Sequence, residues 1–327
     1  MPIFDHLKEG RGGRFDLKIG MYGIGDKSAI ALGTFLRACD LDLQVLDVSY
    51  NSIHDMGMKA ILDAIRCQAY LRIIDLSGNY CSHAAGLSIA RMFTTNNMRH
   101  LYELNLSSCS ILDESMRAIA DAFVGNNALK RLLLSNNRIS RSGAPIAKLI
   151  AHNATITELD LSWNNLRNAD AEHVAEALGS DTVLRTLNLG WNNFGSAGPI
   201  AATALALTTN AALTKLDLSW NRVRENGCAL LGDALKTNRS LRYFIMDGNP
   251  VGDEGGKRLL DKHEPAAADA AAPEDDAAAA AAKKSALLRF VSLQDCNFEN
   301  YQADDGPVEF NVNDPNGQYV KRTRCCC

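Results

Sequence analysis

The segment LTKLDLSWN, from Leu213 to Asn221, is one of ten copies of a single pattern in this chain. The template is L-x-x-L-x-L-x-x-N, followed by an apolar residue and a stretch with helical periodicity. The other copies end at Tyr22, Asn51, Asn79, Cys109, Asn137, Asn164, Asn192, Asn249 and Cys296. Up to Asn249 these ends are 27 to 30 residues apart. A fixed period of this kind decides the architecture, because each repeat is one structural unit that stacks on the next.

Each copy predicts a short strand, a turn and a helix. In residues 43–51, LQVLDVSYN, apolar and polar side chains alternate, which is typical of a strand with one buried face. Asn51 follows the strand, where its side chain can bond turn backbone groups, so successive Asn residues are expected to form a buried ladder. Residues 54–65 then place apolar side chains at helical spacing, which predicts a helix packed on the strand.

Stacking these units predicts the fold class. Neighbouring strands lie about 4.8 Å apart, whereas packed helices lie about 8–10 Å apart, so the helices must lie on the outside of a curved array. We expect an α/β solenoid of about ten repeats, a right-handed horseshoe with a parallel sheet on the concave side and helices on the convex side.

The period, with x-I/L-x-x-x-G/A after the Asn, resembles the ribonuclease-inhibitor type of leucine-rich repeat over about residues 14–298. Within that family, ITELDLSWNNL, LRTLNLGWNNFGSAG and LTKLDLSWNRV resemble the leucine-rich repeat-containing proteins of the seventy-four type. The segment DPNGQY is similar to tails of related repeat proteins of ciliated and flagellated cells. The resemblance implies protein binding through the concave face and its rims.

Domain boundaries follow from where the repeats stop. We expect a cap or extension over residues 1–13, the solenoid over 14–298, and a cap and tail over 299–327. The interval of 47 residues between Asn249 and Cys296 predicts one repeat plus an insertion, the low-complexity Ala-rich segment 264–286. Its second half, EDDAAAAAAKK, favours a helix and is expected to supply the one before the final strand. The insertion is either a partner-binding excursion or a tolerated surface loop.

Composition excludes several classes of protein. The net charge of −4 gives no general affinity for nucleic acid. No apolar run reaches the roughly 20 residues of a membrane span, and the amino-terminal residues are too polar for a signal peptide. The cysteines outside the tail are scattered without C-x-x-C spacing, which indicates a reducing compartment. We expect a cytoplasmic protein, with a cilium, flagellum or cytoskeletal assembly as the narrower expectation.

The stretch GMYGIGDKS, residues 20–28, comes nearest to a catalytic motif. Gly20 and Gly25 have the spacing of a phosphate-binding loop, but Asp26 precedes Lys27, and an acid is electrostatically wrong in a phosphate cradle. No catalytic triad motif or paired-cysteine metal motif is present, and the histidines occur singly. We therefore expect no enzymatic activity, no cofactor and no metal.

The outward positions of the repeats hold the candidate binding residues. The three tryptophans precede the Asn in consecutive repeats and should form a row along one rim, where exposed aromatics concentrate binding energy. The middle strand position is polar and mildly acidic, so a basic partner would be complementary. The predicted protein-binding set is Trp163, Trp191, Trp220, Asp160, Asn188, Asp217, Glu158, Lys215 and Tyr243. The alternatives are that the Asp, Asn and Ser side chains bond one another and that the indoles stack to shield the Asn ladder.

The carboxy-terminal sequence KRTRCCC is a separate feature. Cys325, Cys326 and Cys327 are lipidation candidates beside basic residues, and two acyl chains would anchor the chain to a membrane. The alternative is an unmodified tail without membrane contact.

These features predict a non-enzymatic scaffold whose partners are proteins, within a large assembly of ciliary or cytoskeletal type. One alternative is a GTPase regulator of the nuclear-transport GTPase-activating type, since those proteins share this kind of repeat. The other alternative is an adaptor anchored by its lipidated cysteines.

Overall fold

The computed structural model describes residues 14–38, 42–66, 68–94, 98–181, 183–260, 288 and 290–296. Across these ranges strands and helices alternate in chain order from β1 to β10, as the repeat predicts. The chain divides into two compact units, Met1–Asn165 and Leu166–Cys327, and each is described by itself.

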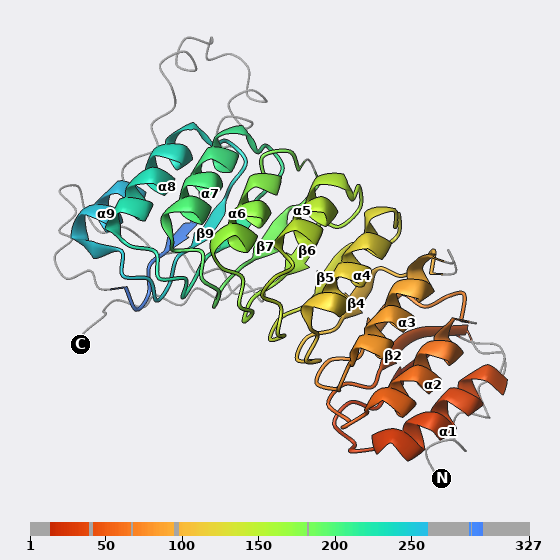
Figure 1. The fold of residues 1–327 in the computed structure, drawn as a ribbon. Helices are drawn as coiled ribbons and strands as arrows, with labels where there is room; N and C mark the ends of the chain where they lie inside the picture. Colours follow the sequence, from red (N-terminus) through yellow and green to blue (C-terminus); the bar gives the residue numbers. More distant parts are fainter. Residues whose placement is uncertain are drawn as a thin grey trace. The chain divides into compact units, whose positions relative to one another are not determined.

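The first unit contains six parallel strands in chain order, with helices covering one face of the sheet (Figure 1). Its elements are β1 (Arg14–Lys18), α1 (Gly25–Ala38), β2 (Asp42–Asp47), α2 (Asp55–Ile65), β3 (Ile73–Asp75), α3 (His83–Thr94), β4 (Glu103–Asn105), α4 (Asp113–Val124), β5 (Arg131–Leu133), α5 (Gly143–His152) and β6 (Glu158–Asp160). The other face of the sheet is called the open sheet face below.

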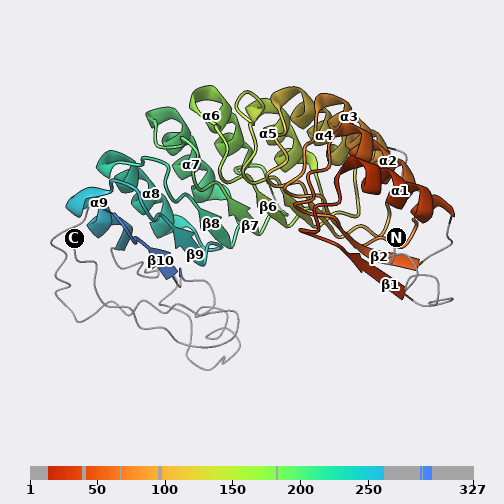
Figure 2. The same cartoon turned by 90° about the horizontal axis from the view of Figure 1, so that it is seen from below.

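The second unit repeats this arrangement with four parallel strands, and Figure 2 shows its helices on a single side of the strands. Its elements are α6 (Asn168–Ala177), β7 (Thr186–Asn188), α7 (Ala197–Thr209), β8 (Lys215–Asp217), α8 (Glu225–Thr237), β9 (Tyr243–Ile245), α9 (Gly252–Leu260) and β10 (Phe290–Ser292). The predicted fold class, a β–α repeat solenoid, is confirmed.

Register between the strands aligns equivalent repeat positions. Leu46 of β2 pairs with Ile74 of β3, which pairs with Leu104 of β4, and all three side chains are fully buried. Each fully buried aliphatic side chain of this size stabilises the fold by about 1.5–3 kcal/mol relative to exposure. The period-two apolar positions therefore form the core between the sheet and the helices.

The Asn at the end of each template links neighbouring repeats. The Oδ1 atom of Asn79 accepts hydrogen bonds from the backbone N–H of Asn51 at 3.1 Å and of Ile53 at 3.0 Å. Its Nδ2 atom donates to the carbonyl oxygen of Val48 at 2.9 Å. Asn249 makes the same type of contacts in the second unit. The predicted buried Asn ladder is confirmed within each unit, and it satisfies turn groups that the strands cannot.

Cys109 occupies a ladder position and supplies the hydrogen-bond donor that Asn supplies in other repeats. Its Sγ atom donates to the carbonyl oxygens of Leu76 at 3.3 Å and Ser107 at 3.5 Å, much as an Asn Nδ2 does. Burial raises the pKa of the Cys109 thiol to about 12, so it stays protonated near neutral pH. This agrees with the structural role that its place in the template predicts.

The long interval after Asn249 holds a single repeat. Strand β10 pairs directly with β9, and α9 fills the position of the repeat helix between them. Compared with a repeat of 28 residues, the 47 residues leave 47 − 28 = 19 extra, as expected for an insertion. The Ala-rich segment 264–286 lies outside the described residues, so a helix there stays a prediction.

Candidate protein-binding rim and sheet face

One backbone conformation recurs at the residue before the ladder position in all ten repeats. These residues form the strand-end rim, and each has a positive φ between 51° and 67°, in the left-handed region. They are Met21, Tyr50, Gly78, Ser108, Asn136, Trp163, Trp191, Trp220, Gly248 and Asp295. Gly, Asn and Asp suit this conformation, whereas it is an outlier for bulky side chains.

Trp191 and Trp220 stack on the rim of the second unit. Their ring centroids are 4.5 Å apart with an interplanar angle of 14°. The ring of Trp220 also lies against the backbone of Gly248, because a Cβ atom there would overlap the indole. The side chains are nevertheless 39% and 40% exposed. The predicted stacking of the indoles is therefore present in this pair, and both residues also remain exposed; partner binding stays a prediction.

Trp163 occupies the equivalent rim position of the first unit. It has a φ of 54° and is 51% exposed. A non-glycine residue in the left-handed region costs roughly 1–2 kcal/mol. Three indoles at such positions are therefore held at an energetic cost that Gly, as at Gly78, avoids.

The predicted sheet residues of the second unit lie on adjacent strands. Lys215 on β8 pairs with Tyr243 on β9, and both side chains are exposed. One step towards the rim, Asn188 on β7 pairs with Asp217 on β8. The structure therefore brings four predicted residues together on the open sheet face of this unit.

The acidic residues of the middle strand position bond locally. The Oδ1 atom of Asp160 accepts from both the backbone N–H and the hydroxyl of Ser162, at 2.9 and 2.7 Å. Asp217 and Ser219 make the same pair of contacts. These bonds run within a repeat, two residues apart, as the alternative of local bonding predicts.

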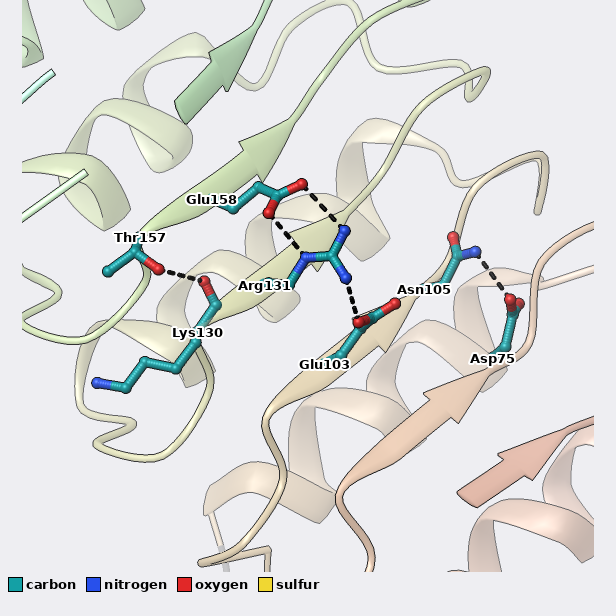
Figure 3. A network of polar contacts seen from close by, with 7 residues as sticks. All are labelled: Asp75, Glu103, Asn105, Lys130, Arg131, Thr157 and Glu158. Atoms are coloured by element: carbon teal, nitrogen blue, oxygen red, sulfur yellow. Dashed lines mark hydrogen bonds and ion pairs between the residues drawn. The ribbon is translucent and has the colours of Figure 1, made fainter. Parts of the chain in front are cut away.

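Arg131 bonds carboxylates on both neighbouring strands of the open sheet face of the first unit (Figure 3). Its guanidinium donates two hydrogen bonds to the carboxylate of Glu158, at 2.7 and 3.1 Å, and a third to Glu103 on the other neighbouring strand. The hydrogen bond to Glu158 is the main cause that raises the pKa of Arg131. The carboxylate of Glu158, predicted to face a partner, is thus already held by an internal cation.

Asp26 has a structural role in the stretch that resembles a phosphate loop. Its Oδ1 atom accepts from the backbone N–H groups of His54 at 2.8 Å and Gly57 at 3.1 Å, at the start of α2. An acid in the first turn of one helix thus caps the next helix, where a negative charge is favourable. This geometry agrees with the expectation that residues 20–28 do not cradle a phosphate.

Comparison with known proteins supports the assignment of the fold as a repeat solenoid. A family model described as a leucine-rich repeat matches residues 41–62, 97–120, 152–175, 180–201, 209–232 and 237–260. The ribonuclease inhibitor of Sus scrofa is 28% identical over 253 residues, which is 76% of this chain and 55% of the inhibitor. The chain is a leucine-rich repeat protein of the ribonuclease-inhibitor type. Proteins of this kind are in general binding scaffolds and not enzymes.

Other relatives of this leucine-rich repeat protein are much longer than it is. Protein CARMIL of Dictyostelium discoideum is 28% identical over 220 residues, covering 63% of this chain and 18% of the relative. The rat capping protein, Arp2/3 and myosin-I linker protein 3 is 25% identical over 228 residues, covering 67% and 17%. The chain thus spans less than a fifth of these two relatives and about half of the inhibitor.

Two solved structures match parts of this chain at low TM-scores. The actin-binding site 2 of leiomodin-1 has a TM-score of 0.32 and 21% identity, over 49% of this chain and 76% of that one. The tropomodulin C-terminal domain of Caenorhabditis elegans has a TM-score of 0.36 and 16% identity, over 56% and 92%.

A second set of buried amides was not anticipated from the sequence. Asn210 lies between α7 and β8, and its Nδ2 donates to the carbonyl oxygen of Leu178 at 2.6 Å. Its Oδ1 accepts from the backbone N–H groups of Ala212 and Leu213, at 2.9 and 2.7 Å. The equivalent residues in other repeats are the buried Asn153 and Asn238, the half-buried Asn126 and the carboxylate of Asp181. The signal was an Asn or Asp three residues before the first Leu or Ile of the next L-x-x-L-x-L template.

Several predictions fall on residues that the structure does not describe. They concern the cap 1–13, the tail 299–327 and the lipidation candidates Cys325, Cys326 and Cys327. Across the described ranges, no helix has the length and apolar character needed to cross a bilayer. Within the same ranges, no group of three or more His, Cys, Asp or Glu side chains is arranged to hold a metal.

Proposed function

We propose that this leucine-rich repeat protein is a non-enzymatic scaffold that binds protein partners through its strand-end rim and open sheet face. In the second unit the contact residues are Trp191, Trp220, Asn188, Lys215, Asp217 and Tyr243. In the first unit they are Trp163 and Asp160, with Glu158 contributing through its pair with Arg131.

The stacked pair of Trp191 and Trp220 carries this proposal. Both indoles occupy left-handed positions where Gly248, in the next repeat, has no side chain at all. Their rings stack on one another, and both residues nevertheless remain exposed. Trp is enriched among the residues that dominate binding energy. Stacked indoles at the rim, with the polar Asn188, Asp217 and Lys215 further along the strands, suit a partner surface with an apolar centre and polar margin.

The relatives suggest a narrower class of partner. The name of one of them states that it links capping protein, Arp2/3 and myosin-I. We extend this to a cytoskeletal assembly as the setting of the present chain, while the ciliary setting stays a prediction from the tail segment DPNGQY. The name of another relative states that it inhibits ribonuclease, which supplies a contrasting candidate.

The test measures binding of the full chain to purified capping protein, Arp2/3 complex, myosin-I and a pancreatic-type ribonuclease. We expect micromolar or tighter binding to at least one of the three cytoskeletal proteins. The double variant Trp191→Asn/Trp220→Asn, whose new residues tolerate a positive φ, should weaken that binding about tenfold or more. The control is Leu205→Asn, which introduces the same residue at a position of α7 that is 71% exposed and lies outside the rim and the open sheet face.

The proposal fails if none of these proteins binds, or if the double variant and the control bind equally well. Binding to ribonuclease alone would retain the scaffold and overturn the cytoskeletal assignment. Circular dichroism of each variant checks that the repeats remain folded.

A further inference from the structure

The rim of the first unit carries a second apolar surface, separate from the tryptophans. It consists of Met21, Tyr22, Tyr50, Met56 and Tyr80, here called the Met–Tyr patch. Their side chains are between 45% and 77% exposed. None of them belongs to the contact residues proposed above, and all lie in the first three repeats.

Backbone contacts join the three loops that carry the patch. The N–H of Tyr22 donates to Oδ1 of Asn51 at 2.9 Å, which joins the loop of the first repeat to that of the second. The N–H of Tyr80 donates to the carbonyl oxygen of Ile53 at 2.9 Å, which joins the second loop to the third. The ring of Tyr50 lies against the backbone of Gly78, just as Trp220 lies against Gly248.

The backbone of the patch has its donors engaged internally. Among the described loops, hydrogen bonds within the unit take the N–H groups of Met21, Tyr22, Ile24, Tyr50 and Tyr80. An extended peptide gains affinity mainly from main-chain hydrogen bonds, which these donors cannot supply. A helix satisfies its own backbone and needs side-chain contacts alone. Methionine-rich and aromatic surfaces suit such helices because the thioether side chain adapts to their shape.

The charge around the patch favours a partner helix with a positive net charge. The loops and helix starts at residues 19–30, 47–60 and 75–88 contain four aspartates and two lysines, which is a formal charge of 2 − 4 = −2. Asp55 directly precedes Met56, and the carboxylate of Asp47 lies beside Gly20, next to Met21. A cationic partner is therefore complementary to this surface.

We propose that the Met–Tyr patch is a docking surface for a basic amphipathic α-helix of a partner protein. The apolar side of that helix covers the methionines and tyrosines, and its Lys or Arg residues face Asp47 and Asp55. The patch and the Trp191–Trp220 pair share no residue, so the chain has two sets of binding residues and can link two partners.

The test uses a fluorescein-labelled peptide of 18 residues, with Leu and Lys arranged at helical spacing, and a twin with Glu in place of Lys. Fluorescence anisotropy measures the binding of both peptides to the full chain at physiological salt. We expect the Lys peptide to bind about tenfold or more tightly than the Glu peptide. The double variant Met21→Asn/Met56→Gln should lower the affinity for the Lys peptide about tenfold, and Asp55→Asn should lower it less.

The matched control is Leu205→Gln, which changes an apolar residue of α7 that is 71% exposed in the second unit. It should bind the Lys peptide as the unchanged chain does, and so should Trp191→Asn/Trp220→Asn. Equal binding of the two peptides, or equal affinity of the Met variant and the control, overturns the proposal. A dimer in sedimentation that the Met variant abolishes would assign the patch to a second copy of the chain instead.

Discussion

The indole ring of Trp220 lies directly against the backbone of Gly248, one repeat further along the strand-end rim. Gly248 has a φ of 65°, and the ring occupies the space where its side chain would be. In the first unit Tyr50 lies on Gly78 in the same way. In both cases the aromatic ring occupies the space that a side chain of the glycine position would need.

Replacing Gly248 by Ala should therefore lower the free energy of unfolding by about 2–4 kcal/mol, through the left-handed backbone and the overlap with Trp220. Denaturant unfolding followed by tryptophan fluorescence and circular dichroism measures this loss. The control is Gly125→Ala, where φ is −95° and a Cβ atom meets nothing within 4 Å. If the two variants unfold at the same denaturant concentration, the contact between Trp220 and Gly248 contributes nothing.

Asp113 should make stability depend on pH. Burial alone would raise the pKa of this carboxyl group, but hydrogen bonds from the backbone of Arg141 and Ser140 and from two serine hydroxyls lower it overall. A depressed pKa in the folded state stabilises the chain above the unfolded value of about 4, and this contribution is lost as pH falls through the folded pKa. Asp113→Ala should cost about 1 kcal/mol at pH 7, with the difference vanishing near pH 2.

The control for Asp113 is Asp121→Ala, which removes an exposed ion pair with Lys148. Such pairs contribute about 0–1 kcal/mol, so this variant should be close to the unchanged chain at every pH. A cost for Asp113→Ala that stays constant down to pH 2 would show that its carboxylate charge is not the cause.

The repeat pattern was sufficient to predict the strands, the helices and the Asn ladder, because all three follow from residues with a fixed spacing. Leu46 and Asn51 have equivalents in nearly every repeat, so one copy explains the others. The left-handed conformation of Trp191 and Trp220 could not be predicted in this way, since local propensity favours Gly or Asn there. The geometry of the repeat overrides that propensity, because the same conformation recurs at all ten rim positions, including Met21 and Ser108.

Helix α9 is a second feature that local propensity does not predict. Its sequence, GDEGGKRLL, contains three glycines and is a weak helix former compared with the Ala-rich segment that follows. It is nevertheless the helix that packs against α8, where Gly232 leaves room for the backbone of Arg258. The position in the repeat, and not intrinsic propensity, decides which residues form this helix.

The second set of buried amides should matter as much as the Asn ladder. Asn210→Ala removes three side-chain hydrogen bonds of 2.9 Å or shorter and leaves their buried backbone partners unsatisfied. The expected loss is about 2–4 kcal/mol in the free energy of unfolding, measured by chemical denaturation. Asn226→Ala on α8 is the control, because that residue is exposed in the same unit. A loss as small as that of the control would mean that water replaces Asn210 without cost.

Arg131 should be needed to hold two carboxylates close together on the open sheet face. Its partners Glu103 and Glu158 are only 17% and 34% exposed, so removing the cation leaves two partly buried negative charges without their counterion. Arg131→Met should lower the free energy of unfolding at pH 7 by about 1–2 kcal/mol. Adding Glu103→Gln and Glu158→Gln should restore most of that loss, because the neutral amides need no counterion. A double-mutant cycle isolates the coupling free energy between Arg131 and the two glutamates. It compares the denaturation of four chains, with Arg131 kept or replaced and with both Glu kept or both replaced. If the Gln residues restore nothing, the loss comes from the packing of the Arg131 stem rather than from its charge.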